Sequence, residues 1–225
     1  MATGIEFSRS ALLLGKTSIE ILAEKHVVLF GLGGVGSFVM EALARTGIGR
    51  LTIVDGDSVD ITNINRQLIA LHSTVGRRKT EAARERIADI NPGCKITAID
   101  RFVSASDAAE IIRGCDYVAD AIDTVSVKLA IAEYCNSEGV PLISCMGMGN
   151  KLDPTQIEVS DISKTSVCPL AKTIRKQLRA KGINHSKVVY SRELPNRFDK
   201  SEEHRRTTAS ISFVPSVGGL IIASQ

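Results

Sequence analysis

A glycine-rich turn is the first feature of this chain that could do chemistry. The residues Gly31, Gly33, Gly34 and Gly36 lie in the segment Val27–Gly49, "VVLFGLGGVGSFVMEALARTGIG". Glycines placed after a strand and before a helix let backbone N–H groups approach phosphate oxygens at the helix N-terminus. The motif therefore predicts a nucleotide held by its phosphates, and by itself it fits NAD and ATP equally well.

An aspartate at the end of the next apolar run supplies a second part of a nucleotide site. Asp55 ends the predicted strand Arg50–Asp55. A carboxylate at that place can accept hydrogen bonds from ribose hydroxyls. Asp57 follows it, and we group it with the nucleotide-binding residues. Neither aspartate distinguishes NAD from ATP.

The polar residues that follow favour a triphosphate. They are Asn63, Arg66, Gln67 and Lys79. The two cations, Arg66 and Lys79, can neutralise charge that develops at phosphorus, whereas a nicotinamide ring has no need of that much positive charge. No hydride-transfer acid or substrate clamp is apparent in the sequence. Taken singly, each cation could be a solvated surface residue, so it is their joint spacing that favours ATP.

Two further charged residues could complete the site. Asp123 ends the predicted strand Tyr117–Asp123, where a carboxylate beside phosphates is a natural Mg²⁺ ligand with waters in the other positions. The alternative is that Asp123 caps the helix that follows. Arg9 lies in the polar "FSRS" before an apolar helix, and it could reach the site of a neighbouring subunit.

Alternating strands and helices must position these residues. The predicted strands are His26–Gly31, Arg50–Asp55, Lys95–Asp100, Tyr117–Asp123 and Pro141–Met146. The predicted helices are Val35–Thr46, Gly76–Ile90, a helix capped by Ser106 that ends at Gly114, and Val125–Glu138. This alternation predicts an α/β fold, a Rossmann-like, doubly wound and mainly parallel sheet.

The pattern changes in the C-terminal part. The short strands "IEVSDI" and "KVVYS" flank a predicted helix Pro169–Lys181, a long loop spans Ser191–Ala209, and "SISFVP" reads as a last strand. The chain then stops inside "VGGLIIASQ", which suggests a C-terminal helix that is missing or cut short. We predict a single adenylation-type domain over residues 1–225. It comprises an N-terminal helical arm (1–25), an ATP-binding core (26–150) and an extension facing the substrate (151–225).

Composition excludes several classes of protein. The 225 residues are 44% hydrophobic and 24% charged, an ordinary globular mixture. No apolar run is long enough to span a bilayer, and the N-terminus lacks a signal-peptide layout. The five cysteines are odd in number and none form a CxxC pair, which argues against a disulfide framework and a zinc site. We therefore expect a cytoplasmic protein without a membrane span.

Positive charge is concentrated near the C-terminus. The net charge is +3, but the segment 172–206 alone holds eleven Lys/Arg and four Asp/Glu. Such a segment suggests an anionic partner such as RNA, and the alternative is a solvated helix face followed by a charged loop.

Four segments together resemble the ubiquitin-activating superfamily, in its bacterial ThiF/MoeB/HesA branch. They are "GLGGVGS", "IVDGDSVDITNINRQ", "HSTVGRRKTEAARERIADINP" and "AIDTVSVK", within roughly residues 5–150. The resemblance implies a domain that binds ATP and Mg²⁺ and adenylates a carboxylate. It also implies roles for individual residues: Gly33 and Gly36 at the phosphates, Asp55 at the ribose, Asn63, Arg66 and Lys79 at the triphosphate, Asp123 at Mg²⁺, and Arg9 reaching across a homodimer.

The second half resembles the tRNA threonylcarbamoyladenosine dehydratase subgroup (TcdA/CsdL). The similar segment is "GMGNKLDPTQIEVSDISKTSVCPLAKTIRKQLRAKGI". The resemblance implies ATP-dependent cyclisation of a modified adenosine beside the tRNA anticodon, and it strengthens the RNA interpretation of segment 172–206. Sulfur-carrier activators usually carry two CxxC pairs, which this chain lacks. Activation of a sulfur-carrier protein, with a sulfur-relay partner, stays an alternative, as does an NAD-dependent oxidoreductase.

Cys168 precedes Pro169 at a predicted helix start. A thiolate there would be stabilised by the helix dipole and could act as a nucleophile. Members of the resembling subgroup often have Asp at this place, which caps a helix but is no thiol. Capping is therefore the favoured role of Cys168.

Overall fold

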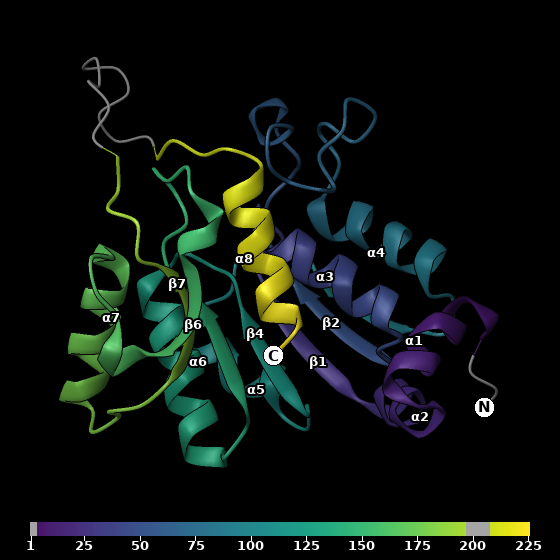
Figure 1. Ribbon diagram of the computed structural model, residues 1–225, viewed down its shortest axis with the longest axis horizontal. Coiled ribbons are helices and arrows are strands. Elements are labelled where there is room, and N and C mark those ends of the chain that lie inside the picture. The colour runs from purple at the N-terminus through teal and green to yellow at the C-terminus, as the bar shows by residue number, and fades with distance from the viewer. Residues whose placement is uncertain (1–3, 197–207) are drawn as a thin grey trace.

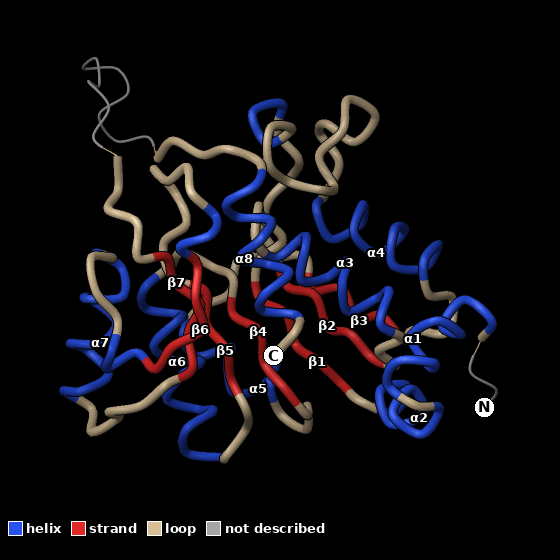
Figure 2. Tube along the Cα trace, viewed as in Figure 1, coloured by secondary structure: helices blue, strands red, loops and turns tan. Residues whose placement is uncertain are grey.

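A seven-stranded sheet forms the centre of the protein (Figures 1 and 2). The computed structural model describes residues 4–196 and 208–225, and its strands follow the order β3-β2-β1-β4-β5-β7-β6. The strands are β1 (His26–Phe30), β2 (Arg50–Val54), β3 (Lys95–Ile99), β4 (Tyr117–Asp120), β5 (Leu142–Cys145), β6 (Ile157–Asp161) and β7 (Lys187–Ser191). All neighbouring strands are parallel except β6 and β7, so the predicted mainly parallel sheet is confirmed.

Helices cover both faces of the sheet because successive strand residues, which point to opposite faces, are both apolar. In β1, Leu29 packs in a core cluster with Val39, whereas its neighbour Phe30 packs in another cluster with Ile131. The first face carries α3 (Gly36–Thr46), α4 (Lys79–Ile90) and α8 (Phe213–Ala223), and the other carries α5 (Ala108–Ile112), α6 (Val125–Glu138) and α7 (Pro169–Ala180). Helices α1 (Ser8–Leu14) and α2 (Lys16–Glu24) lie beyond the amino end of β1 (Figure 1).

The register brings three candidate segments to one edge of the sheet. Phe30, the last residue of β1, pairs with Val54 of β2 on one side and with Asp120 of β4 on the other. The glycine turn and the loops after β2 and β4 therefore leave the sheet side by side. This is the point where strand order reverses, and such points are where open α/β sheets bind their ligands.

Three predicted ends of helices or strands differ from the structure by a few residues. β4 ends at Asp120 and not at Asp123, so Asp123 lies in the loop before α6. α4 begins at Lys79 and not at Gly76. The turn that leads into α5 is capped by Ser104, whose backbone N–H donates to the Asp107 carboxylate, so the prediction of Ser106 as the cap was wrong. An acidic residue three places after the cap was the signal for this capping box.

The predicted strand "SISFVP" was also wrong. Its second half begins α8, where Pro215 lies in the first turn and costs no backbone hydrogen bond. Gly219 lets the helix approach α3 closely, since a Cβ at Gly219 would collide with the carbonyl oxygen of Val35. Burial against α3 thus overrides the β-propensity of the Ile and Val residues.

Part of the C-terminal prediction falls outside the described residues. The long loop at Ser191–Ala209 includes residues 197–207, which are not described. The division into arm, core and extension stays a prediction.

Candidate functional site

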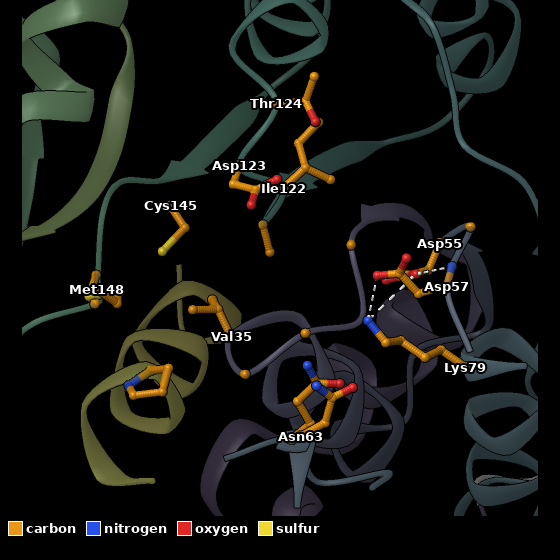
Figure 3. Close-up of a pocket in the computed structure, with 18 of the residues that line it drawn as sticks. Val35, Asp55, Asp57, Asn63, Lys79, Ile122, Asp123, Thr124, Cys145 and Met148 are labelled. Atoms are coloured by element: carbon orange, nitrogen blue, oxygen red, sulfur yellow. Dashed lines mark hydrogen bonds and ion pairs between the residues drawn. The ribbon is translucent and has the colours of Figure 1, made fainter. Parts of the chain in front are cut away.

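A cleft of about 810 Å³ opens at the carboxyl edge of the sheet. Figure 3 shows it with Lys79 and Asp55 on one side, Asp123 on another, and Cys145 and Met148 opposite Lys79. Ten of the predicted site residues line it: Gly31, Gly33, Gly34, Asp55, Asp57, Asn63, Arg66, Gln67, Lys79 and Asp123. The fold therefore brings together residues that are spread over much of the chain.

The glycine turn exposes its backbone to the cleft. Gly31 has φ +88°, and its N–H donates to the carbonyl oxygen of Val54 at 2.8 Å. In front of Gly33 the space is open, and a Cβ there would find its nearest neighbour, Nε2 of Gln67, at 4.0 Å. Gly36 does not line the cleft. A Cβ at Gly36 would collide with the carbonyl oxygen of Gly31, so its part is to let the turn close.

Asp55 ties this turn to the neighbouring loop. Its carboxylate accepts hydrogen bonds from the N–H of Leu32 at 2.7 Å and from the N–H of Asp57 at 2.9 Å. The side chain is only 9% exposed, so the two bonds fix its position. Asp55 thus holds the glycine turn at the cleft as well as presenting a carboxylate to it.

Lys79 lies between two carboxylates at the first residue of α4. Its Nζ is 2.8 Å from Oδ2 of Asp57 and 3.9 Å from Oδ1 of Asp55, and the side chain is 6% exposed. A cation is unfavourable at the positive end of a helix dipole, so the aspartates compensate for its place there. Because Asp57 is about half exposed, a phosphate group can replace it as the partner of Lys79.

The segment after Asp57 folds into a tight turn that carries the polar residues Asp60, Asn63 and Gln67. The 3₁₀ turn Ile61–Asn63 is capped by Asp60, whose N–H donates to Oδ1 of Asn63 at 3.1 Å. The N–H of Gln67 donates to the carbonyl of Asn63, and Oε1 of Gln67 is buried without a hydrogen-bond partner among the described residues. An unpartnered buried acceptor is costly, which marks Gln67 as a group that a ligand would satisfy.

Arg66 is half-buried and lines the cleft. It donates to the carbonyl of Thr62 at 3.0 Å and to Oδ1 of Asn65 at 2.8 Å. Its aliphatic stem lies beside Gly34, where a Cβ would come within 3.2 Å of it. A side chain at position 34 would therefore push Arg66 away from the glycine turn.

Asp123 is not a helix cap. The cap of α6 is Thr124, and the described residues contain no hydrogen bond or ion pair to the Asp123 carboxylate. The carboxylate is thus available to a ligand in the cleft. No group of three His, Cys, Asp or Glu residues suited to hold a metal occurs within residues 4–196 and 208–225. A metal at Asp123 would have to share its coordination with a substrate and with water.

One wall of the cleft is formed by uncharged residues and was missed by the sequence analysis. We call it the neutral half, and it is lined by Cys145, Met146, Gly147, Met148, Gly149, Leu170, Thr208, Ser210 and Pro215. Burial raises the pKa of the Cys145 thiol to about 12, so that residue is uncharged at neutral pH. The repeat "MGMGN" at the end of a predicted strand was the available signal, since glycines there let other segments pack closely: a Cβ at Gly149 would collide with the side chain of Thr208.

Two rim residues were also missed. Arg101 and Phe102 line the cleft after β3, and Phe102 is 75% exposed. The loop beneath them is held by Arg78, which bonds both carboxylate oxygens of Asp100 at 2.8 Å and the carbonyl of Gly56 at 2.7 Å. Hydrogen bonding from Arg78 lowers the pKa of Asp100. No sequence motif marked Arg101 and Phe102 as residues of the site.

Besides Gly36, two predicted residues do not line the cleft. Sγ of Cys168 is buried and accepts the N–H of Ala171 at 3.5 Å, which confirms its capping role. Arg9 is exposed on α1. Any contact between Arg9 and a nucleotide would therefore have to be made in another subunit.

Comparison with known proteins agrees with this architecture. The sequence profile of the ThiF family matches residues 7–225. A tRNA threonylcarbamoyladenosine dehydratase from Bacillus subtilis (strain 168) is 44% identical over 98% of this chain and 92% of its own length. The corresponding protein of Escherichia coli (strain K12) is 45% identical over 77% of this chain, and the alignment spans 65% of the E. coli protein.

Solved structures extend the similarity to the whole fold. Crystal structures of the E. coli dehydratase in complex with AMP and with ATP match this chain with TM-scores of 0.90 and 0.89. Both are 38% identical and cover 97% of this chain, and the matched parts are 91% and 90% of the E. coli chains. The E. coli molybdopterin-synthase adenylyltransferase is more distant, at 36% identity over 56% of this chain.

A further finding concerns the helices. Within the described parts of the chain, no helix combines the length and the apolar character that crossing a bilayer requires. Taken together, the profile match over nearly the whole length and the similarity to the B. subtilis protein show that this chain belongs to the ThiF family.

Proposed function

We propose that this chain is an ATP-dependent tRNA threonylcarbamoyladenosine dehydratase, which adenylates the threonine carboxylate of the modified nucleoside and cyclises it to the hydantoin. The observation that carries the proposal is the division of one cleft into a charged part, with the glycine turn, Arg66 and Lys79, and the neutral half. ATP suits the first part. The uncharged adenine and ureido groups of the modified nucleoside suit the second, with the threonine carboxylate turned toward ATP. The dehydratases among the relatives, one of them solved with ATP, support this assignment.

In the proposed reaction, a carboxylate oxygen attacks the α-phosphorus of ATP and pyrophosphate leaves. Arg66 and Lys79 stabilise the charge that develops on the phosphate oxygens. The acyl-adenylate is then attacked at its carbonyl carbon by a ureido nitrogen of the same group. That nitrogen loses its proton, the five-membered ring closes, and AMP leaves. Because ring closure is intramolecular, orientation in the neutral half supplies much of its acceleration.

Asp123 is the proposed Mg²⁺ ligand. Its carboxylate lines the cleft and makes no bond to the described residues, which fits a metal shared with ATP phosphates and water. When bound, Mg²⁺ would neutralise charge on the phosphates. Gln67 and Asn63 would bind the nucleotide from the opposite wall, and Asp55 would accept the ribose hydroxyls.

The proposed homodimer follows from the position of Arg9. Since it lies outside the cleft of its own chain, its proposed role at the phosphates requires a homodimer in which each subunit supplies Arg9 to the other. A sulfur-relay partner and a cytoplasmic location remain predictions.

Mass spectrometry tests the proposed reaction directly. The protein is incubated with ATP, Mg²⁺ and tRNA that carries threonylcarbamoyladenosine, and the digested RNA is examined for loss of one water from that nucleoside. We expect one AMP per nucleoside converted. Asp123→Asn should reduce the rate by about 10²-fold or more, because it removes a charged metal ligand. The control is Asp89→Asn, which changes an exposed carboxylate on α4.

The alternatives predict different results. Carrier-dependent pyrophosphate exchange that is indifferent to tRNA would indicate an activator of a sulfur-carrier protein. Tight NADH binding without ATP binding would indicate an oxidoreductase. Either result, with no change in the nucleoside, would overturn the proposal.

A further inference from the structure

Helix α7 has one apolar face and one cationic face. Ala171, Ile174 and Leu178 are buried in the core cluster that α7 shares with α6 and β7. Lys172, Lys176 and Arg179 are exposed and follow one another at intervals of four and three residues. This spacing places the three cations on one side of the helix. We call them the α7 cationic stripe.

Within the described part of the chain, no carboxylate compensates the charges of the stripe. Among the described residues, no Asp or Glu lies within ion-pair distance of Lys172, Lys176 or Arg179, and α7 itself contains no acidic residue. Three arginines of another segment show the contrast. On α4 and just before it, Arg77, Arg78 and Arg86 each pair with a carboxylate.

Such a stripe works against the stability of its own helix. Like charges three and four residues apart repel each other, and Lys172 lies in the N-terminal part of α7, where the helix dipole disfavours a cation. A fourth basic residue shows the contrast. Arg175 is partly buried and donates to the carbonyl oxygen of Thr165 at 2.9 Å, so it fastens the helix to the preceding loop. An anionic partner would relieve the repulsion between the three remaining cations.

The stripe starts beside the cleft. Leu170, two residues before Lys172, lines the neutral half, and Sγ of the cap Cys168 is 3.5 Å from where a Cβ of Gly147 would be. From there the three cations extend along about 10 Å of helix, at a rise of about 1.5 Å per residue. In Figure 1, α7 lies at the edge of the molecule beyond β6 and β7, where a long ligand can reach it.

We infer that the α7 cationic stripe binds the phosphate backbone of the RNA whose modified nucleotide enters the neutral half. The inference rests on the proposed function for the identity of the ligand. Phosphates spaced along a backbone match cations spaced along a helix, and contacts of this kind position a nucleic acid without reading its sequence. Lys172 would contact the backbone nearest the reacting nucleotide, and Arg179 the backbone farthest from it.

The test compares two triple variants that remove the same charge. Lys172→Gln/Lys176→Gln/Arg179→Gln removes the stripe. The matched control, Arg84→Gln/Lys95→Gln/Arg113→Gln, removes three exposed cations that make no ion pair among the described residues. Those residues belong to α4, β3 and the end of α5, and β3 is at the opposite edge of the sheet from β6. Circular dichroism confirms that both variants fold.

The first measurement is the affinity for unmodified tRNA as a function of salt concentration. Each phosphate contact contributes about 0.7–0.9 to the slope of log K against log [salt], so the stripe variant should lose about 2 to 3 from that slope and the control should lose almost nothing. The single variant Lys176→Gln should lose about 1 from the same slope. It replaces the triple variant in this test if the triple variant does not fold. An unchanged slope, or an equal loss in the control, overturns the inference.

The second measurement separates this inference from the proposed function. In the dehydration assay the stripe variant should show a raised KM for tRNA and an unchanged KM for ATP. If the native protein binds tRNA through the stripe but converts no nucleoside, the proposed function fails and the RNA surface stands. If the native protein converts the nucleoside and the stripe variant has the native KM for tRNA, the proposed RNA contact at the stripe is wrong and the proposed function stands. Binding of an acidic polypeptide through the stripe, with no tRNA binding, overturns the inference in favour of a protein partner.

Discussion

Nζ of Lys128 on α6 lies 2.7 Å from Oδ2 of Asp120, the last residue of β4, and both side chains are almost completely buried. Oδ1 of the same aspartate accepts the N–H of Ile122 at 3.2 Å. One buried carboxylate thus connects the start of α6, the end of β4 and the loop that carries Asp123. Because burying two charges is expensive, this arrangement is better explained as a means of fixing that loop than as a source of stability.

The first prediction concerns this pair. Lys128→Met leaves the Asp120 carboxylate buried without a partner, and it should lower the free energy of unfolding by about 3–5 kcal/mol. The double variant Asp120→Asn/Lys128→Met removes both charges and should recover much of that loss. Urea unfolding measures both changes.

The control for this prediction is an exposed pair. Lys25 and Asp116 are 2.9 Å apart, with side chains 46% and 35% exposed, so Lys25→Met should cost at most about 1 kcal/mol. If Lys128→Met costs no more than Lys25→Met, the buried pair does not have the role assigned to it.

The second prediction tests whether Arg9 acts in another subunit. Arg9→Ala and Asp123→Asn should each be nearly inactive. When the two variants are mixed and allowed to exchange subunits, heterodimers form in which one of the two sites has both native residues. An equal mixture should recover roughly a quarter of the native activity in the dehydration assay. Full activity of Arg9→Ala alone, or a mixture as inactive as its components, would rule out the shared site.

The third prediction separates the two roles considered for Cys168. Cys168→Ser keeps a side chain that can cap α7 and removes the thiol, so its activity should stay close to native. Cys168→Ala removes the cap and should lower the free energy of unfolding by about 1 kcal/mol with little effect on the reaction rate. Loss of activity in both variants, with stability preserved in Cys168→Ser, would instead support a nucleophilic thiol. Rate measurements and thermal unfolding distinguish these outcomes.

The fourth prediction is a pH dependence at the contact between α3 and α4. Glu41 accepts hydrogen bonds from Arg86 at 2.6 and 2.9 Å and from Arg45 at 2.8 Å. Burial alone would raise the pKa of Glu41, but hydrogen bonds from Arg86 and Arg45 outweigh burial and lower it below 4.5. A lowered folded-state pKa stabilises the protein above the unfolded-state pKa, and this stabilisation is lost as the pH falls through the folded-state value.

Glu41→Gln should therefore lower the free energy of unfolding by about 1–2 kcal/mol at neutral pH. The difference from the native protein should shrink as the pH is lowered below 4.5. Urea unfolding at a series of pH values measures it, and Glu85→Gln, at an exposed pair with Arg77, should show a much smaller change. A difference that is constant with pH would mean that the charge of Glu41 does not matter.

The sequence by itself determined the fold class and the charged part of the cleft. Each strand and helix of the core is a local pattern of apolar residues with glycine or an acidic residue at its end, so the positions of Gly31, Asp55 and Asp123 relative to the sheet edge could be predicted. Lys79 and Arg66 were found because they follow Asp55 closely in the chain. The capping role of Cys168 was favoured because members of the resembling subgroup often have Asp, a good helix cap, at this place.

Only the tertiary structure decided the rest. The neutral half is assembled from segments between Cys145 and Pro215 that meet only after β5, α7 and α8 have packed. The second half of "SISFVP" became the start of α8 because Gly219 allows burial on α3. Two features depend on distances between elements: the burial of Lys128 with Asp120, and the lack of ion-pair partners for the α7 cationic stripe within residues 4–196 and 208–225. Local sequence patterns carry no such distances, because they are set by how whole helices and strands pack.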